Sequence, residues 1–361
     1  MKVNFNKAQK EFYNETTMAI NDYFRENKLS RKANPFMVFK TLFYLSFLLG
    51  SYIVLLTINV NASVFFALWM ILGLSSVFLV VNCGHDAIHG AFANRKWINT
   101  FMRLSYDLLG ANSYLWEISH NGIHHTYTSI EEVDGDLVSV PFTRLTPNQN
   151  IKSYHQFQHM YVFFLYSFAT LYWVFIKDYK KFFQLQSAGS KKSIPKVQYF
   201  NLFSYKIIYY SIFLAIPLFI INKPWHYICG GFLISHFIEG ITIATIFALA
   251  HIVEKANFYK ADEDGNIENN WAIHQMYTTV NFGSKSNLTA FLCGGLNFQI
   301  EHHLFPSICH VHYPVISKII KGKALKHGIP YLEYTTFYAA LKSHIRLLKR
   351  LGRLEGSSGL N

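Results

Sequence analysis

Four long apolar runs dominate the pattern of hydrophobic and polar positions along the chain. About 20 consecutive apolar residues cross the hydrocarbon core of a bilayer as one helix. The runs that are long enough to span lie at about 36–60, 63–81, 204–221 and 225–250. A fifth run, at about 160–177, is shorter and crowded with Tyr and Trp, whose amphipathic rings favour the membrane interface. The pattern therefore predicts four transmembrane helices and one interfacial segment.

Charged residues are distributed unevenly between the connections. The connections at 59–63 and 222–225 are short and carry Lys223 as their one charged residue. Residues 1–35, the connection 177–206 and the C-terminal region are instead rich in Lys and Arg. Because connections with an excess of Lys and Arg stay in the cytoplasm, the charges predict that both termini are cytoplasmic.

The composition also favours a membrane protein. Of the 361 residues, 51% are hydrophobic and 15% are charged, whereas about 25% are charged in an ordinary soluble domain. The net charge of +12 comes from basic residues that avoid the apolar runs, so we expect no nucleic-acid partner. The four cysteines have no CxxC spacing, which argues against a zinc finger or a disulfide framework.

The sequence is expected to hold one membrane domain with a short segment at each end. Residues 1–35 are charged and helix-permissive, and they lack the apolar core and cleavage site of a signal peptide. Residues 36–354 contain the four spans and their connections. Residues 355–361, at the end of LEGSSGLN, depart from the basic helical pattern before them and read as a cloning linker.

Histidines form three clusters that follow the apolar runs. Residues three or four apart lie on one face of a helix, so each cluster aims its imidazoles in one direction. Neutral imidazole suits iron, zinc or copper, and seven such donors exceed what one four-coordinate metal uses, which predicts two metals. The clusters are HDAIH with His85 and His89, HNGIHH with His120, His124 and His125, and QIEHH with Gln299, His302 and His303.

The order of the spans tests whether the three clusters can meet. They lie on the cytoplasmic side together only if the run at 160–177 does not cross the membrane. We therefore expect this run to lie in the interface or to re-enter. The isolated pair His155 and His159 has a spacing that arises by chance, so it is given no metal.

The order HDxxH, HNxxHH and QxxHH, followed by HLFP, resembles the membrane fatty-acid desaturase family over residues 34–349. Gln299 in place of a first histidine is similar to front-end acyl desaturases and to bacterial acyl desaturases of the linoleoyl-CoA type. The resemblance implies an all-α integral membrane fold, with four helices under a cytoplasmic helical cap. It also implies a non-haem di-iron centre that uses O2 and two electrons to desaturate a fatty acyl chain.

The same resemblance implies the partners. The acyl carrier is coenzyme A, acyl carrier protein or a phospholipid. The chain has no HPGG haem-binding motif, so electrons come from a separate ferredoxin or haem protein with its reductase. The basic cytoplasmic face suits such an acidic carrier and equally the phosphates of coenzyme A. We expect a multi-pass protein of a bacterial inner membrane rather than of the endoplasmic reticulum.

Two irons at five or six coordination need more donors than the three clusters supply. In stearoyl-CoA desaturases, which the chain resembles more distantly, a further ligand comes from the cytoplasmic end of the fourth span, where His251 lies. The alternative for His251 is a histidine stabilised by the helix dipole. His274 is a candidate by donor count and position alone. Gln299 is expected to act through a water or a hydrogen bond, because an amide oxygen replaces imidazole poorly at iron.

Several other polar residues have two interpretations. Asp86, Asp134 and Asp136 either orient ligating imidazoles or are solvated or capping acids. His236 and Glu239 lie within the fourth span, where they pair with each other or border an acyl channel. A structural role is expected for His310 and His312.

Three other classes of protein share part of this pattern. A di-iron hydroxylase or ketolase has the same histidine logic and differs in its product. A zinc-dependent membrane hydrolase or receptor needs only three histidines and an open position. A di-haem cytochrome fits less well, because haem ligands come singly on facing helices.

Overall fold

The computed structural model describes residues 3–137, 142–187 and 194–353. The chain divides into two compact units, and each is treated by itself. Unit 1 comprises residues 1–34, 119–163 and 246–361, and unit 2 comprises residues 35–118 and 164–245. The predicted linker at 355–361 lies outside the described residues.

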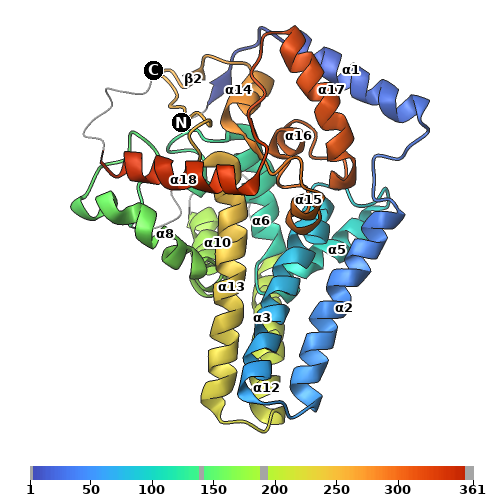
Figure 1. The fold of residues 1–361 in the computed structure, drawn as a ribbon, viewed down its shortest axis with the longest axis vertical. Coiled ribbons are helices and arrows are strands. Elements are labelled where there is room, and N and C mark those ends of the chain that lie inside the picture. Colours follow the sequence, from blue (N-terminus) through green and yellow to red (C-terminus); the bar gives the residue numbers. More distant parts are fainter. Residues whose placement is uncertain (1–2, 138–141, 188–193, 354–361) are drawn as a thin grey trace. The chain divides into compact units, whose positions relative to one another are not determined.

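Unit 2 is helical, and it contains most of the apolar sequence. Its first two helices, α2 and α3, run side by side (Figure 1). The helices that begin in this unit are α2 (Pro35–Thr57), α3 (Ala62–Leu79), η1 (Val80–Gly84), α4 (His85–Ile88), α5 (Lys96–Leu108), α6 (Ser113–Ser119), α9 (Ala169–Tyr172), η5 (Trp173–Lys177), α10 (Asp178–Ser187), α11 (Lys196–Tyr210), η6 (Ser211–Ala215), α12 (Ile216–Ile220) and α13 (Trp225–His251).

The prediction of four candidate spans is confirmed. Among the residues that the structure describes, four helical stretches are long and apolar enough to cross a membrane, at Pro35–Thr57, Ala62–Ile88, Lys196–Ile220 and Trp225–His251. The apolar run suggested that the third span begins at Ser204, but its helix begins earlier, at Lys196. Its first turns include Lys196, Gln198 and Asn201, which a helix accommodates although they lower the hydropathy that marks a span.

Small residues let the helices of unit 2 approach closely. A Cβ atom at Gly73 would lie 2.7 Å from the Ser235 carbonyl oxygen, and one at Gly231 would lie 2.3 Å from the Trp69 ring. Close backbone approach of this kind is typical of helix packing in membranes, where packing rather than the hydrophobic effect joins helices.

The run at 160–177 is a broken helix. Two helical stretches, Ser153–Ser167 and Ala169–Gln184, meet at an angle of 57°. The break lies against Gly240 of α13, where a Cβ atom would meet the Ser167 carbonyl oxygen at 2.5 Å. The prediction that this run is interfacial or re-entrant concerns a membrane and stays a prediction.

Unit 1 holds short helices around two small parallel strand pairs. In β1–β2, Phe5 aligns with Ile267, and in β3–β4, Phe282 aligns with Tyr334. Its elements are β1 (Asn4–Phe5), α1 (Glu11–Glu26), η2 (His120–His124), α7 (His125–Tyr127), η3 (Gly135–Leu137), η4 (Ser153–Phe157), the start of α8 (Gln158–Ser167), β2 (Asn266–Ile267), α14 (Trp271–Thr278), β3 (Asn281–Phe282), α15 (Asn287–Cys293), α16 (Gln299–Leu304), η7 (His310–His312), α17 (Tyr313–Lys326), β4 (Glu333–Tyr334) and α18 (Phe337–Leu351).

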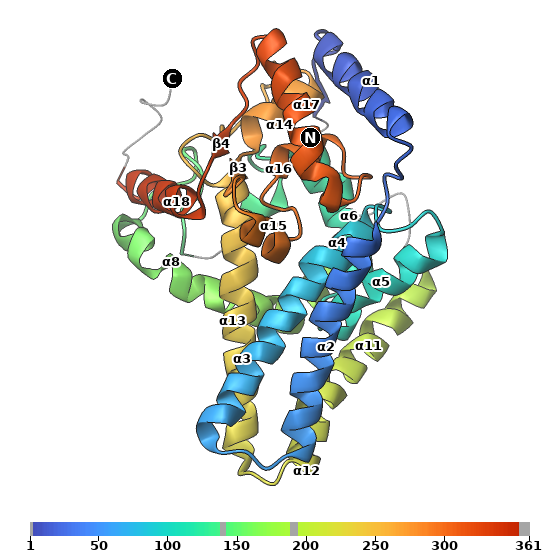
Figure 2. The ribbon, with the colours of Figure 1, turned by 45° about the vertical axis from the view of Figure 1, so that its right-hand side comes forward.

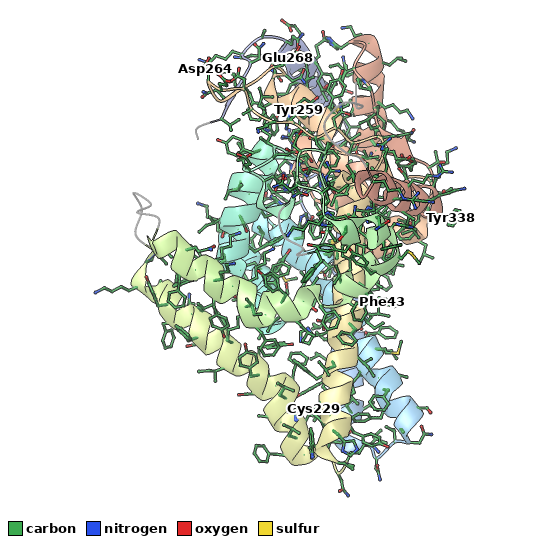
Figure 3. The ribbon with its side chains drawn as sticks, turned by 90° about the vertical axis from the view of Figure 1, so that its left-hand side faces the viewer. Phe43, Cys229, Tyr259, Asp264, Glu268 and Tyr338 are labelled. Carbon is green, nitrogen blue, oxygen red and sulfur yellow. The ribbon has the colours of Figure 1, made fainter. Side chains whose placement is uncertain are left out.

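The N-terminal helix is an integral part of unit 1. Phe12, Ile20 and Phe24 repeat at helical spacing on one face of α1, and this face is buried. It belongs to the same core as Ile316 and Ile320 of α17, which lies beside α1 (Figure 2). The connection before α14 carries Tyr259, Asp264 and Glu268 beside the β1–β2 pair (Figure 3).

Candidate metal centre

Two groups of buried histidines lie within unit 1. The ligand atoms of His124, His251 and His303 all lie within 4.8 Å of one another, and the same holds for His125, His302 and His303. His303 belongs to both groups and is fully buried. The structure therefore brings together the second and third sequence clusters and His251, which was expected to join them.

The second cluster is carried by an irregular helix. His120–His124 form one π-helical turn, and α7 continues from His125. The rings of the adjacent residues His124 and His125 are nearly perpendicular, with an interplanar angle of 84°. Such π turns inside helices are frequent at functional sites. The sequence spacing predicted a shared face for an α-helix, and the π turn was not foreseen.

In the first group, each imidazole is held by a hydrogen bond at Nδ1. His124 Nδ1 lies 3.1 Å from Asp134 Oδ2, His251 Nδ1 lies 3.3 Å from the Thr278 carbonyl oxygen, and His303 Nδ1 lies 2.9 Å from Gln275 Oε1. Because these oxygens accept hydrogen bonds from Nδ1–H, the lone pair of each ring, when neutral, is on Nε2. This arrangement is typical of metal-binding histidines.

Asp134 is an orienting residue rather than a solvated loop acid. Its side chain is buried, and it also accepts the backbone N–H of Ser129 at 2.9 Å. The side chain of Asp136, the other candidate in this turn, lies outside the described residues.

Gln299 lies between two of these ring nitrogens. Its Nε2 is 2.9 Å from His251 Nε2 and 3.3 Å from His303 Nε2. The amide NH2 group of Gln299 donates hydrogen bonds to the lone pairs of these two imidazoles. The same lone pairs are the ones that would coordinate a cation. Three imidazoles oriented through Nδ1, with their Nε2 atoms close together, therefore fit a transition metal.

The second group is packed more closely. The His125 and His303 rings stack with centroids 4.3 Å apart, and His125 Nε2 lies 3.2 Å from His120 Nε2. His302 Nδ1 lies 3.3 Å from the Tyr313 hydroxyl oxygen. Adjacent imidazoles at these distances favour neutral rings, because two imidazolium ions side by side repel each other.

His274 is not brought into either group. Its Nε2 hydrogen-bonds the Thr128 carbonyl oxygen at 2.7 Å, and its ring packs against Phe5 and Tyr259. Burial lowers the pKa of His274 to about 4, so the ring is neutral. The next residue, Gln275, faces the histidines instead, because one step along a helix turns the side chain by about 100°.

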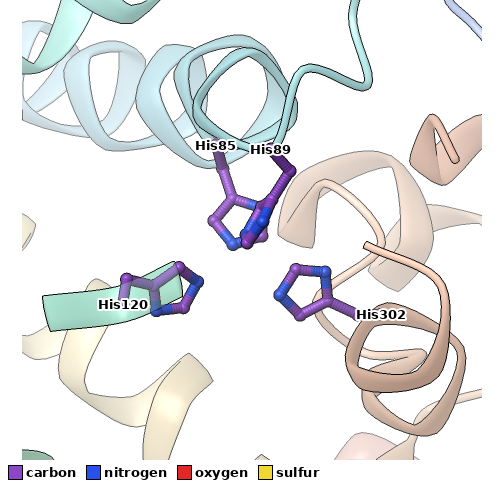
Figure 4. A group of neighbouring side chains, drawn as sticks. All are labelled: His85, His89, His120 and His302. Atoms are coloured by element: carbon purple, nitrogen blue, oxygen red, sulfur yellow. The ribbon is translucent and has the colours of Figure 1, made fainter. Parts of the chain in front are cut away.

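The first sequence cluster lies in unit 2. His85 and His89 leave the same short helical stretch, with ring centroids 4.9 Å apart, and Figure 4 draws them with His120 and His302 of unit 1. A π turn, Val80–Gly84, precedes these two histidines. The second cluster is likewise associated with a π turn, His120–His124. Gly84 allows α5 to pack here, since a Cβ atom would lie 2.4 Å from Ser105 Oγ. Asp86 is buried in the same turn.

Sequence reasoning missed the partners of the histidines. Gln275 accepts from His303 and from the Thr128 hydroxyl at 2.8 Å, and it donates to the His125 carbonyl oxygen at 3.3 Å. Thr128 offered one signal, because it follows His124 by four residues in a helical cluster. Gln275 and Thr278 offered no such signal, since they are distant in sequence from the histidines that they contact, His303 and His251.

A second missed network fixes α16. Glu301 accepts hydrogen bonds from Asn281 Nδ2 and from the Tyr331 hydroxyl, each at 2.7 Å. Asn281 also accepts the Ile300 N–H at 3.0 Å. Burial raises the pKa of Glu301 to about 7. The helix that presents His302 and His303 is thereby tied to β3 and to residue 331.

In unit 2, His236 pairs with Glu239, which lines a cavity. His236 Nδ1 lies 3.4 Å from Glu239 Oε2, and the Tyr209 hydroxyl lies 2.7 Å from His236 Nε2. The cavity is lined by Ser76, Val77, Val80, Tyr106, Leu109, Ala111, Thr170, Trp173, Val174, Glu239 and Ile243. The lining is mainly apolar, and the carboxyl group of Glu239 is its acidic member.

His310 and His312 have structural contacts. His312 Nε2 lies 3.2 Å from the Lys32 carbonyl oxygen. The backbone of Gly295 lies so close to His310 that a Cβ atom there would meet the His310 Cβ at 2.4 Å.

The chain is similar to known proteins along most of its length. The family model described as fatty acid desaturase matches residues 61–335. The chain is 34% identical over 337 residues to the sn-1 linoleoyl-lipid 6-desaturase of Synechocystis sp., covering 92% of this chain and 93% of that protein. It is 31% identical to the protein of the same name from Arthrospira platensis, covering 97% and 95%. It is 32% identical to the acyl-lipid (8-3)-desaturase of Physcomitrium patens, covering 96% and 72%.

Proposed function

Because the chain belongs to the fatty acid desaturase family, we propose that it is an O2-dependent acyl desaturase with a non-haem di-iron centre. The reaction removes two hydrogens from adjacent methylene groups. It consumes O2, two electrons and two protons, and it yields one carbon–carbon double bond and two waters. The observation that supports this most strongly is the group His124, His251 and His303, each oriented through Nδ1.

The histidines divide between two irons in this proposal. One iron is held by His124, His251 and His303. The remaining histidines of the three sequence clusters, His85, His89, His120, His125 and His302, are proposed as ligands of the iron pair on the sequence pattern alone. When bound, the iron pair supplies the oxidising power that an unactivated C–H bond requires.

The residues around the histidines then have defined tasks. Asp134, Gln275 and the Thr278 carbonyl hold the Nδ1 protons and so keep Nε2 basic toward the metal. Gln299 and Asp86 act beside the irons through hydrogen bonds rather than as ligands. His274 positions the chain by its bond to the Thr128 carbonyl oxygen. Burial of Asp134, Gln275 and Gln299 excludes bulk water from these hydrogen bonds.

The substrate proposed is the acyl chain of a membrane lipid. Two of the relatives are named for acting on linoleoyl-lipid, and a third is an acyl-lipid desaturase. A lipid tail is apolar, and the cavity of unit 2 offers Val77, Leu109 and Ile243 as a border to it, although its volume of about 40 Å³ is too small to enclose a whole tail. Acyl-CoA and acyl carrier protein are the alternative carriers.

Electrons are supplied from outside the chain in this proposal, by a ferredoxin or a haem protein with its reductase. The protein is placed in a bacterial inner membrane, with both termini and the metal centre on the cytoplasmic side. The Lys and Arg distribution and the four candidate spans support this orientation.

Expression in a host of known lipid composition tests the function. Mass spectrometry of the cellular lipids should reveal one new double bond, which His303→Ala should abolish while the protein still accumulates. A hydroxylated or ketone product in place of the double bond would overturn the desaturase assignment. One zinc and no iron in the purified protein would overturn the di-iron centre.

A further inference from the structure

One surface of unit 1 carries an unbalanced stripe of positive charge. The opposite face of α18 is buried through Leu347, Leu348 and Leu351. The stripe repeats at helical spacing and consists of exposed side chains, at Lys342, Arg346, Lys349, Arg350 and Arg353.

These cations have no acidic neighbours on their own helix. The sequence of α18 contains no Asp or Glu, and none of the five makes an ion pair within the described residues. Elsewhere in unit 1, Lys326 pairs with Glu15 and Lys321 with Glu333. Like charges four residues apart destabilise a helix, so the stripe has a cost that an external anion would remove.

Exposed apolar side chains lie beside the stripe. Gln158 Nε2 donates to the Leu348 carbonyl oxygen at 2.7 Å, which fastens the start of α8 to α18. On either side of this anchor, Phe157 is 53% exposed and Met160 is 72% exposed. Burial and the charges of Lys349 and Arg353 lower the pKa of His159, which lies between Phe157 and Met160 in the sequence.

The N-terminal end of α18 has the same character. Tyr338 is 70% exposed at the start of the helix (Figure 3). It precedes Lys342 by four residues and therefore lies on the charged face. Aromatic and basic side chains on one helical face are typical of helices that lie in a membrane interface.

We propose that the α18 face, defined as the five cations with Tyr338, Phe157 and Met160, rests on an anionic phospholipid surface. The guanidinium and ammonium groups contact headgroup phosphates, and Phe157 and Met160 enter the boundary between headgroups and acyl chains. A soluble acidic protein would satisfy the charges but gives no reason for two exposed apolar side chains beside them. This inference concerns binding and does not depend on the proposed reaction.

The test uses the full chain in nanodiscs of phosphatidylcholine with a minor fraction of phosphatidylglycerol. A photoactivatable phosphatidylglycerol probe is crosslinked, and the labelled peptides are mapped by mass spectrometry. Labelling should concentrate at residues 153–163 and 337–353, and should exceed that by a matched phosphatidylcholine probe several-fold. Raising the salt from about 0.1 M to about 1 M should reduce the difference, since the Debye length shortens from about 10 Å to about 3 Å.

The charge-removing variant is Arg346→Gln/Lys349→Gln/Arg350→Gln, in which glutamine preserves helix propensity. Labelling of this variant by the phosphatidylglycerol probe should decrease at least threefold. Its thermal unfolding temperature should be no lower than that of the parent. The matched control, Lys7→Gln/Lys10→Gln/Lys28→Gln, removes the same charge from exposed positions of unit 1 and should keep the labelling.

Three results would overturn the proposal. The first is equal labelling of the α18 face by the neutral and anionic probes at every salt concentration. The second is unchanged labelling in the α18 variant. The third is an α18 variant that keeps its labelling but no longer binds a soluble acidic electron carrier, which would assign the face to that carrier.

Discussion

His124 Nδ1 lies 3.1 Å from Asp134 Oδ2, and both side chains are buried. The bond joins the π-helical turn His120–His124 to the loop that follows it. It fixes the orientation of the ring and the nitrogen that carries its proton. Asp134 thus determines whether His124 can present Nε2 together with His251 and His303.

Asp134→Asn should weaken metal binding more than it weakens the fold. Loss of a carboxylate partner typically costs about 10–100-fold in metal affinity or activity. We expect reduced iron content and turnover, measured by elemental analysis and product formation. Glu132→Gln is the control, because Glu132 is exposed in the same turn and should leave both values unchanged. Wild-type iron content in Asp134→Asn would show that the carboxylate does not support the ligand.

His251→Ala should lower the iron content by about one of two ions, because His251 is assigned to the first iron. His274→Ala should instead retain both irons and lose roughly 1–3 kcal/mol of stability, since a buried hydrogen bond to Thr128 is broken. Elemental analysis and thermal unfolding separate the two outcomes. If His251→Ala keeps two irons and full turnover, its role is confined to the helix terminus.

Ala111→Leu should reduce desaturation of long acyl chains without changing the iron content. Ala111 lines the cavity of unit 2, so a larger side chain removes space that the proposed acyl tail needs. Ala67→Leu, at an exposed position of α3, is the matched control and should be neutral. Product profiles from a mixture of chain lengths measure the effect. An unchanged profile in Ala111→Leu would place the tail elsewhere.

The stability of the protein should fall as the pH decreases from about 6.5 toward 4, in part because of His344. Burial lowers the pKa of His344 to about 4 from 6.5, and its Nδ1 donates to the Ile252 carbonyl oxygen at 2.6 Å. Between these pH values the unfolded chain binds a proton that the native state excludes. The contribution is of the order of 3 kcal/mol.

Thermal unfolding of the parent and of His344→Gln across this range measures the effect. Glutamine cannot titrate, so the variant should show a shallower dependence on pH although it is less stable at neutral pH. Equal slopes for the two proteins would show that another group is responsible.

Purified protein with substrate, O2 and NADPH should be inactive until a reductase and an electron carrier are added. The sequence contains no HPGG haem motif and no GxGxxG nucleotide motif. Consumption of NADPH coupled to desaturation is the measurement. Turnover without added proteins would reveal a redox module in this chain.

The sequence by itself determined the four candidate spans and the residues of the three histidine clusters. Both are local properties, because the hydropathy of a run is set by its own residues, and a spacing of three or four fixes a shared face on a helix. His251 was also found, although only a resemblance to another desaturase singled it out.

Only the tertiary structure decided which groups surround these histidines. The sequence singled out His274 and gave no signal for Gln275, but the rotation of α14 turned Gln275 toward His303 and His274 toward Thr128. Gln275 meets Thr128 across 147 positions of the chain, and Thr278 meets His251 across 27. Contacts between distant segments depend on how helices pack, and no local pattern encodes that packing.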